Sequence, residues 1–410
     1  MRVLILSFFY HPEPNDIKAH ALGRELVARG HDVTAITTFP NYPTGEIYDG
    51  YSQKWRQWEN KDGVKVARIP LYADHSRSSI KRALSYLSFL TTASVLGPIL
   101  SGKPDIMWVY QPPLTTGMAG WWISKLRRVP YVYEIQDMWP ETLTSTGMIN
   151  NQGALRVLAE IALRMYSSAS AITVISPGFK QNLIDKGVLP EKIHMISNWA
   201  DETIYLPVPR DPEIGEQYGL NGKFNIIFGG NMGPAQALQS AIDAAEALQD
   251  LPDLQFVMIG DGLDLPSLQE SVTEKGLSNV IFLGRQPSEK MPQFFAWGDA
   301  LLVQLKNEPL FSITIPSKTL AYLASGRPIL SAVGGDGAEV VREAGAGIVC
   351  PPGDALALEK AIRDLYTMPA SERETMGTSA RTAYETQYRQ SIAIDRYEAL
   401  FQDIITRKRQ

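Results

Sequence analysis

Short runs of β-branched and other apolar residues alternate with longer amphipathic segments along the first half of the chain. Such runs fit buried strands, and helical periodicity fits the longer segments. The predicted strands are 3–7, 33–37, 64–69, 106–110, 131–135 and 171–175, and the predicted helices are 16–29, 79–100, 116–126 and 154–168. Gly30 stands where a glycine would end the first helix. This order predicts a parallel sheet with helices on both faces.

A second series of the same kind follows a proline-containing stretch at 201–221, which the pattern predicts to be a linker. Its predicted strands are 225–228, 255–259, 280–283, 300–303, 328–331 and 348–350, with helices between them and a helical segment at 370–409 that breaks near Gln390. We therefore predict two Rossmann-like α/β domains. The first covers 1–205, and the second covers 215–388. A ligand is expected at the carboxyl ends of the strands, where helices begin.

The composition and the net charge argue against several classes of function and site. The 410 residues include 39 Lys and Arg against 44 Asp and Glu, a net charge of -5, which argues against a nucleic-acid partner bound through its phosphates. Cys350 is the one cysteine, so a disulfide within the chain and a cysteine-rich zinc site are excluded. No two of the five histidines have the spacing of a helical metal site, and no Asp-x-Asp pair occurs, so no metal site is predicted. Ser, Thr, Gly97 and Pro98 interrupt the apolar segment 79–100, which predicts a helix rather than a membrane span.

A glycine turn gives the first sign of chemistry. Phe228-Gly-Gly-Asn-Met-Gly233 follows a predicted strand and opens a helix near Pro234. Glycine lets a ligand approach the backbone, and the amides of a first helical turn attract an anion. Gly230, Asn231 and Gly233 are therefore candidates for binding a diphosphate. The alternative is an ordinary strand–helix turn.

A lysine near a second helix start supports this hypothesis. Pro316 fits the first position of a helix, which places Ser317, Lys318 and Thr319 in its first turn. The helix dipole disfavours a cation in the first turn, and a bound phosphate would explain why a lysine occupies that position. The alternative is an exposed lysine. In Gly284-Arg-Gln-Pro-Ser288, Arg285 could neutralise a second phosphate charge and Gln286 could meet a base edge, or the segment is a surface loop.

Acidic residues gather at a predicted strand end in the first domain. Tyr133-Glu-Ile-Gln-Asp-Met-Trp-Pro-Glu141 places Asp137 beside Trp139. A carboxylate there is a candidate general base for an acceptor hydroxyl, and capping of a short helix is the alternative. Glu13 and Asn15, in the loop after the first strand, could also contact an acceptor.

These motifs and others, in their order and spacing, resemble glycosyltransferase family 4 over essentially the full length, and most closely its bacterial polysaccharide and O-antigen branch. The quoted segments are Leu26-Val-Ala-Arg-Gly-His-Asp-Val33, Tyr133 to Glu141, Val174-Ile-Ser-Pro-Gly178, Ile193-His-Met-Ile-Ser-Asn-Trp-Ala-Asp201, Phe228 to Gly233, Ile259-Gly-Asp-Gly262 and Ala324-Ser-Gly-Arg-Pro328. The resemblance implies a GT-B fold, with the nucleotide in the second domain and the acceptor in the first. It also implies that the last helix, 390–410, returns to the first domain. It also implies retaining transfer from a nucleotide-sugar, usually a UDP-sugar, with no catalytic metal and no further cofactor.

The chain departs from the family pattern at two places. The family commonly carries two glutamates eight positions apart, and this chain has Ile313 and Ala321 there. Many members also have Arg and Lys after the glycine turn, where this chain has Pro234-Ala-Gln236. Lys318 could take over the phosphate contact, and it is assigned a catalytic role together with Asp137.

The expected function is transfer of a sugar, an N-acetylated hexosamine by analogy with the branch, from a UDP-sugar to a glycan or polyprenyl-phosphate-linked acceptor in cell-surface polysaccharide or lipopolysaccharide synthesis. The alternatives are a UDP-sugar 2-epimerase of the same fold and a catalytically silent subunit that binds a sugar nucleotide. We expect a cytoplasmic location, with peripheral contact to an anionic membrane through the basic and apolar segments 77–100 and 119–128. The alternative for those segments is a packed helix with solvated ends.

Overall fold

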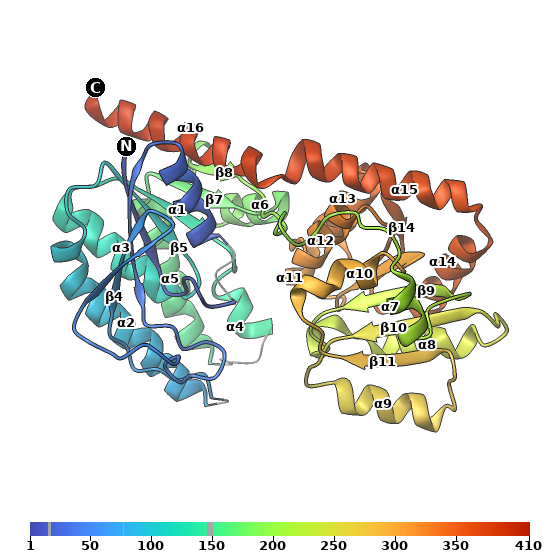
Figure 1. The fold of residues 1–410 in the computed structure, drawn as a ribbon. Coiled ribbons are helices and arrows are strands. Elements are labelled where there is room, and N and C mark those ends of the chain that lie inside the picture. Colours follow the sequence, from blue (N-terminus) through green and yellow to red (C-terminus); the bar gives the residue numbers. More distant parts are fainter. Residues whose placement is uncertain (15–17, 77, 146–150) are drawn as a thin grey trace. The chain divides into compact units, whose positions relative to one another are not determined.

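The computed structural model describes residues 1–14, 18–76, 78–145 and 151–410. Within it the chain forms two compact units. Unit 1 comprises Met1–Ile196 and Ile394–Gln410, and unit 2 comprises Ser197–Ala393. Each unit is an α/β layer structure built on a sheet (Figure 1).

Unit 1 contains an eight-stranded sheet in the order β3-β4-β2-β1-β5-β6-β7-β8, in which β3 alone of the described strands is antiparallel to its neighbour. The strands are β1 (Arg2–Ser7), β2 (Asp32–Thr38), β3 (Gln57–Lys61), β4 (Val64–Ile69), β5 (Ile106–Tyr110), β6 (Tyr131–Ile135), β7 (Ala171–Val174) and β8 (Ile193–Met195). The helices are α1 (Ala19–Ala28), α2 (Ser79–Leu100), α3 (Leu114–Arg127), α4 (Glu141–Ser145), α5 (Gln152–Ser168) and α6 (Pro177–Asp185), and α16 (Gln390–Arg409) joins the unit from Ile394.

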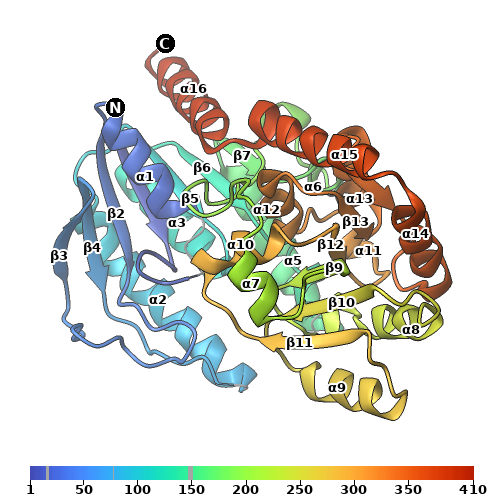
Figure 2. The same ribbon diagram turned by 45° about the vertical axis from the view of Figure 1, so that its right-hand side comes forward.

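Unit 2 contains a six-stranded parallel sheet in the order β11-β10-β9-β12-β13-β14, with β11 at one edge (Figure 2). The strands are β9 (Phe224–Gly229), β10 (Leu254–Ile259), β11 (Val280–Gly284), β12 (Ala300–Gln304), β13 (Ile329–Ala332) and β14 (Gly347–Val349). The helices are α7 (Pro212–Gln217), α8 (Gln239–Ala247), α9 (Leu265–Glu274), α10 (Met291–Phe295), α11 (Pro309–Ser312), α12 (Ser317–Ser325), α13 (Gly335–Glu343), α14 (Ala355–Thr367) and α15 (Ala370–Ala383).

The order of the strands reverses next to the first strand of each unit. In unit 2 the chain runs outward from β9 to β11 and then returns to pair β12 with the other side of β9. In unit 1 the same reversal lies between β1 and β5. Ligands of doubly wound sheets bind outside the strand carboxyl ends at such a point. The topology therefore directs attention to the segments that follow β9 and β12 in unit 2, and β1 and β5 in unit 1.

The predicted strands are confirmed with bounds that match within one residue, and the predicted helices 79–100, 116–126 and 154–168 are confirmed within two residues. Of the predicted helix 16–29, Ala19–Ala28 forms α1, and residues 16 and 17 lie outside the described part of the chain. Ser79–Leu100, Ile106–Tyr110 and Tyr131–Ile135 have the predicted bounds. Gly30 has a φ of 86° and ends α1, as predicted. The break in the last helical segment is also confirmed, since Tyr384–Tyr388 is a π-helical turn and Arg389 is extended before α16 begins.

Several elements differ from the prediction. β3 is a polar edge strand, and β8 has three residues, so neither has the apolar run that predicts a strand. The stretch predicted as a linker contains α7, whose start has the expected signals: the Asp211 side chain accepts the Glu213 amide, and Pro212 is the first helical residue. Pro316 is the residue that precedes α12 rather than its first residue.

A buried polar cluster fastens α16 to the sheet of unit 1. The Lys18 ammonium lies 2.7 Å from Glu134 Oε1 and 3.1 Å from the Tyr397 hydroxyl, and Tyr397 donates to Glu134 Oε2 at 2.6 Å. All three side chains are fully buried. Since a buried charge is tolerated only with paired hydrogen-bonding partners, this cluster fixes which turn of α16 faces β6.

The helix α2 is long and apolar enough to cross a membrane by length and composition alone, and 28% of its most apolar window is buried. In this structure it packs along α3, where a Cβ at Gly97 would clash with Ile123, and Arg127 donates to the Gly102 carbonyl. The outer side of α2 carries apolar side chains at least half exposed: Ile80, Leu84, Leu87, Val95 and Ile99. Their spacing places them on one face of the helix.

Candidate functional site

The glycine turn of unit 2 follows β9 at the point where the strand order reverses. Gly230 has a φ of 131°, which favours glycine. A Cβ on Gly230 would lie 2.6 Å from Lys318 Cε, and a Cβ on Gly260 would lie 1.9 Å from the Gly230 carbonyl oxygen. These contacts place the ends of β9 and β10 and the start of α12 together, so the structure brings Gly230 and Lys318 to one place, as the sequence predicts.

The amides of this turn correct one expectation. Gly230 N donates to the Ile259 carbonyl at 2.8 Å, and Gly233 N donates to Gln236 Oε1 at 3.2 Å. Neither amide is free to bind an anion. In the described part of the turn from 230 to 233, Asn231 N is the amide without a partner inside the chain. The glycines at 230 and 233 therefore act by leaving space, and the amide of Asn231 is the candidate donor.

Lys318 has the most unusual environment in unit 2. Its side chain is partly exposed along its length, but its ammonium nitrogen is buried and has no hydrogen-bond partner among the described residues. The nitrogen lies 3.7 Å from the centroid of the Phe228 ring. Because burial penalises the charged form, the pKa of Lys318 falls to about 7 from its ordinary value of 10.5. A cation held at a helix start without a counter-ion is arranged to receive an anion.

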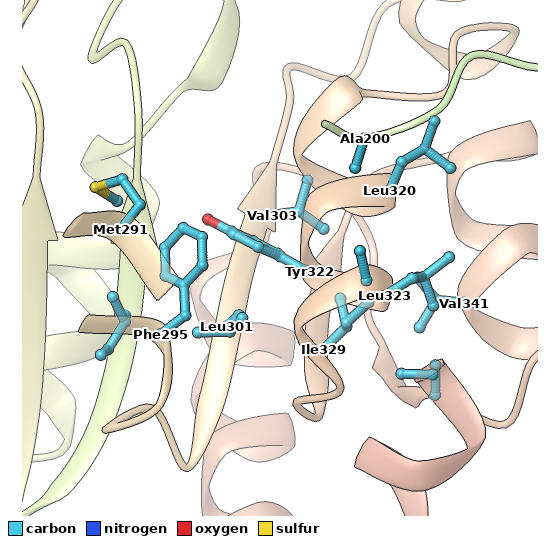
Figure 3. Packing of buried hydrophobic residues seen from close by; sticks show 14 of the residues in the cluster. Ala200, Met291, Phe295, Leu301, Val303, Leu320, Tyr322, Leu323, Ile329 and Val341 are labelled. Atoms are coloured by element: carbon cyan, nitrogen blue, oxygen red, sulfur yellow. The ribbon is translucent and has the colours of Figure 1, made fainter. Parts of the chain in front are cut away.

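The helix that carries Lys318 is fixed to the glycine turn at a second point. The Tyr322 hydroxyl, one helical turn after Lys318, accepts a hydrogen bond from Gly229 N at 3.1 Å. Figure 3 shows Tyr322 reaching from α12 toward Phe295 and Met291, whose side chains leave no room for a Cβ on Gly229. These contacts make Tyr322 a positioning residue for Lys318, a role that the sequence did not indicate, because a tyrosine at this spacing resembles an ordinary core residue.

The other residues predicted to bind the donor are less constrained. Arg285 is exposed, and Gln286 donates to the Leu283 carbonyl at 2.8 Å, which leaves its amide oxygen able to accept. Their loop follows β11, whose Gly284 carbonyl accepts from Gly260 N at 2.9 Å. Ser317 is exposed, and Thr319 is buried with an unpartnered hydroxyl.

In unit 1, Asp137 lies just beyond the carboxyl end of β6. Burial raises the pKa of this carboxyl above its usual value, and no hydrogen bond to a helix start supports the capping alternative, since α4 begins at Glu141. A carboxylate with a raised pKa is a better proton acceptor than an exposed one. Trp139, two residues later, has a buried indole nitrogen without a hydrogen-bond partner among the described residues. The geometry thus permits a proton-accepting role for Asp137.

The two residues predicted in the first loop have different outcomes. Glu13 is buried and accepts from three backbone amides, those of Tyr10, Asn41 and Tyr42. These bonds give it a clear structural task in bracing the loop, and its contact with an acceptor stays a prediction. Asn15 lies outside the described residues.

One residue at the same edge was missed. Gln111 follows β5 directly, is fully buried, and neither polar atom of its side chain has a partner. Its backbone amide donates to the Glu134 carbonyl, which places it beside β6. A buried polar residue immediately after an apolar strand is the sequence signal that could have identified it. Among the described residues no group of three or more His, Cys, Asp or Glu side chains is placed to hold a metal ion.

Comparison with known proteins accords with this arrangement. Residues 18–199 match the glycosyl transferase 4-like domain, and residues 223–368 match glycosyl transferases group 1. The chain is 29% identical over 339 residues to the putative colanic acid biosynthesis glycosyl transferase WcaI of Escherichia coli, covering 80% of this chain and 82% of that protein. It is 28% identical to the probable glycosyltransferase WbjE of Pseudomonas aeruginosa, covering 67% and 69%.

Solved structures resemble it over almost the whole chain. Anabaena Alr3699/HepE in complex with UDP and glucose has a TM-score of 0.70 at 18% identity, covering 98% of this chain and 99% of that one. Sucrose-phosphate synthase from Thermosynechococcus elongatus has a TM-score of 0.72 at 15% identity, covering 99% of both. The fold is GT-B, and the chain is a glycosyltransferase.

Burial of the Lys318 ammonium predicts a stability cost. Between pH 7 and 10.5 the unfolded chain binds more protons at Lys318 than the folded chain does. The free-energy cost of burying the charged lysine is therefore largest below pH 7 and disappears as the pH rises toward 10.5. Lys318→Met should therefore raise the thermal midpoint of unit 2 at pH 7, by an amount that shrinks at pH 10. Differential scanning calorimetry at both pH values measures it. Lys290→Met, at an exposed position, is the control and should change stability by no more than about 0.5 kcal/mol. A lowered midpoint for Lys318→Met would contradict the assignment.

Proposed function

We propose that this glycosyltransferase is a retaining, metal-independent member of glycosyltransferase family 4. It transfers a sugar, an N-acetylated hexosamine in our proposal, from a UDP-sugar to a glycan or lipid-linked acceptor in cell-surface polysaccharide synthesis. The observation that carries the proposal is the buried Lys318 ammonium, which has no counter-ion and faces the glycine turn at the switch point of unit 2. UDP as the nucleotide is supported by the likeness to Alr3699/HepE, whose structure contains UDP.

On the donor side, the reaction needs positive charge where the leaving diphosphate gains negative charge. Electrostatic stabilisation of that charge by fixed groups is the main contribution an enzyme can make at this step. Lys318 supplies a cation, the backbone amides of Asn231, Ser317 and Lys318 supply hydrogen bonds, and the exposed Arg285 supplies a second cation. In this proposal Gln286 accepts from the nucleobase through its free amide oxygen.

Binding of a diphosphate changes the state of Lys318. At neutral pH and without a ligand, Lys318 is uncharged in a large share of the molecules, because burial lowers its pKa to about 7. A diphosphate next to it favours the charged form, so the lysine takes up a proton as the donor binds. The bond between the anomeric carbon and the diphosphate oxygen then breaks through an oxocarbenium-like state, and the acceptor hydroxyl forms the new bond on the same face.

On the acceptor side, Asp137 receives the proton of the attacking hydroxyl. Its raised pKa suits this task, because a base must hold the proton that it removes. Trp139 offers an aromatic face and a free indole N–H for the acceptor sugar. Gln111, at the neighbouring strand end, adds an amide that could orient it.

The donor assignment predicts which nucleotide stabilises the protein. In a thermal-shift screen of UDP-, GDP- and ADP-sugars, UDP-sugars should give the largest shift. A ligand at 100 times its dissociation constant adds about 2.7 kcal/mol to the free energy of unfolding, which such a screen detects.

The role of Lys318 predicts a pH dependence of UDP binding. Above pH 7 the affinity of UDP should fall by up to about tenfold per pH unit in the wild type relative to Lys318→Met, and calorimetry in buffers of different ionisation enthalpy should show proton uptake on binding. If the wild type and Lys318→Met bind UDP with equal affinity and the same pH dependence, Lys318 does not contact the diphosphate.

The base assignment predicts a separation of binding from turnover. Asp137→Asn should keep the UDP-sugar affinity of the wild type and lose about 100-fold or more in kcat, because the amide cannot accept the proton. Glu141→Gln, a carboxylate four residues later that pairs with Lys186, is the matched control and should keep most activity. Transfer by Asp137→Asn at the wild-type rate would refute the role. Formation of the 2-epimer from a UDP-sugar alone would instead favour an epimerase.

A lipid-linked acceptor would bring unit 1 to a membrane, and the surface of α2 and α3 supports peripheral contact at the cytoplasmic face. The outer apolar face of α2 is joined by Trp122 and Leu126 of α3, both exposed. From Ser79 to Arg128 the chain has six cations and one acid, Asp105, although the whole chain has a net charge of -5. Apolar surface bordered by cations suits an anionic leaflet.

This contact is testable with charge-neutral substitutions. The double variant Leu84→Gln/Leu87→Gln should sediment less with phosphatidylglycerol vesicles than the wild type, because two apolar side chains of the docking face are lost. The matched control Leu263→Gln/Leu356→Gln removes two exposed leucines of unit 2 and should behave like the wild type. Equal sedimentation of all three proteins would show that α2 does not make the contact.

A further inference from the structure

We propose that a pocket in unit 1, between α3, α16 and the amino ends of β6 and β7, binds a phosphate-bearing group. The pocket has a volume of about 570 Å³. Tyr131 and Ala171, the first residues of β6 and β7, lie in its wall, whereas Asp137 follows the opposite end of β6. The site is therefore separate from the proposed acceptor site and goes beyond the proposed function.

The lining combines cations with apolar surface. Its cationic members come from the last turns of two helices: Lys125 and Arg128 from α3, and Arg407 and Lys408 from α16. Trp121, Leu400 and Ile404 supply apolar wall. Two carboxylates, Glu191 and Asp403, also line it, so positive charge predominates by two.

Part of this charge is already paired, and part is not. Arg407 Nε lies 2.9 Å from Asp403 Oδ1, and the Lys408 ammonium donates to the Arg128 carbonyl. The side chains of Lys125 and Arg128 have no hydrogen-bond or ion-pair partner among the described residues. Lys125 and Arg128 line the same pocket as Trp121, and a guanidinium and an ammonium together can hold a phosphate by charge-assisted hydrogen bonds.

The backbone at Arg128 is held in an uncommon conformation. Its φ of 54° and ψ of 40° are left-handed, where glycine or asparagine is favoured over arginine. The turn is fixed on both sides, because Val129 N donates to the Ser124 carbonyl at 3.1 Å and Ser124 Oγ donates to the Val129 carbonyl at 2.6 Å. An arginine at this position is explained if its side chain binds a ligand that the chain itself does not provide.

A ligand in this pocket would bridge two parts of unit 1 that are far apart in sequence. One wall belongs to α16 and the others to α3 and the sheet. A phosphate that contacts Lys125 and Arg407 together would add to the attachment that Tyr397 makes earlier in the same helix. Occupancy should therefore slow amide hydrogen exchange in the last turns of α16.

The source of the phosphate is either a lipid headgroup or a free phosphate ester. Trp121 lines the pocket, and the next residue, Trp122, is exposed beside the apolar face of α2 and α3. An anionic lipid could thus place its headgroup in the pocket while its chains stay at that face. A soluble phosphate ester would use the same cations without the apolar contact.

The test compares two double variants that remove equal charge from the same two helix ends. Lys125→Gln/Arg407→Gln removes two pocket cations, and Arg127→Gln/Arg409→Gln removes two neighbours that do not line the pocket. The full chain is titrated with glycerol phosphate and with phosphatidylcholine vesicles that contain or lack phosphatidylglycerol. The pocket variant should bind at least about tenfold more weakly than the wild type, and the control should stay within about twofold.

Each outcome decides the proposal. Selective loss with glycerol phosphate supports a free phosphate ester, and selective loss with phosphatidylglycerol vesicles alone supports a lipid headgroup. Equal loss in both variants means diffuse attraction to the surface, and no binding of either probe by the wild type means no site; both results overturn the proposal. UDP affinity should be unchanged in both variants, so a failure here is distinct from a failure of the donor assignment.

Discussion

An ammonium ion that has left water without acquiring a hydrogen bond is the constraint on which the proposed chemistry of unit 2 depends. The Lys318 nitrogen is buried against the face of Phe228, and the absence of a side chain at Gly230 provides the space. Such an arrangement costs free energy in the empty protein. It persists because the Tyr322 hydroxyl and the apolar core around Phe295 hold α12 against the end of β9. A site of this kind is prepared before its ligand arrives, so little reorganisation remains to be done on binding.

Unit 1 contains a buried lysine with the opposite character. Lys18 meets Glu134 and Tyr397 at hydrogen-bonding distance, and Thr173 donates to the same carboxylate. Its charge is compensated, and its task is to hold α16 against the sheet. The contrast between Lys18 and Lys318 separates a structural cation from one proposed to bind a ligand, although both ammonium groups are buried and both have pKa values lowered by burial. Sequence position does not distinguish them, whereas hydrogen-bond partners do.

The architecture was largely predictable because buried parallel strands are short apolar runs with few alternatives. The bounds of β5 and β6 and of α2 follow directly from such patterns. The polar edge strand β3 and the short helix α7 were not predictable in this way, since one lacks an apolar run and the other lies among prolines. For the site, spacing was enough to associate Gly230 with Lys318. It could not show that the amides of Gly230 and Gly233 are already used, or that the Tyr322 hydroxyl accepts from Gly229 N, because the apolar pattern does not specify these individual hydrogen bonds.

The crowding at Gly260 has a consequence for altering the proposed donor specificity. A Cβ on Gly260 would lie 1.9 Å from the Gly230 carbonyl oxygen, and a Cβ on Gly262 would lie 2.3 Å from the Met232 carbonyl oxygen, so the loops after β9 and β10 pack tightly against each other. Substitutions introduced at Gly260 or Gly262 by directed evolution would disrupt the packing of these loops by steric clash before they changed the donor preference. The loop after β11, where Arg285 is exposed and Gln286 is tied only through its own side chain, has no such restriction. A library confined to that loop would therefore be expected to yield folded enzymes with new selectivity more often than one aimed at the glycines.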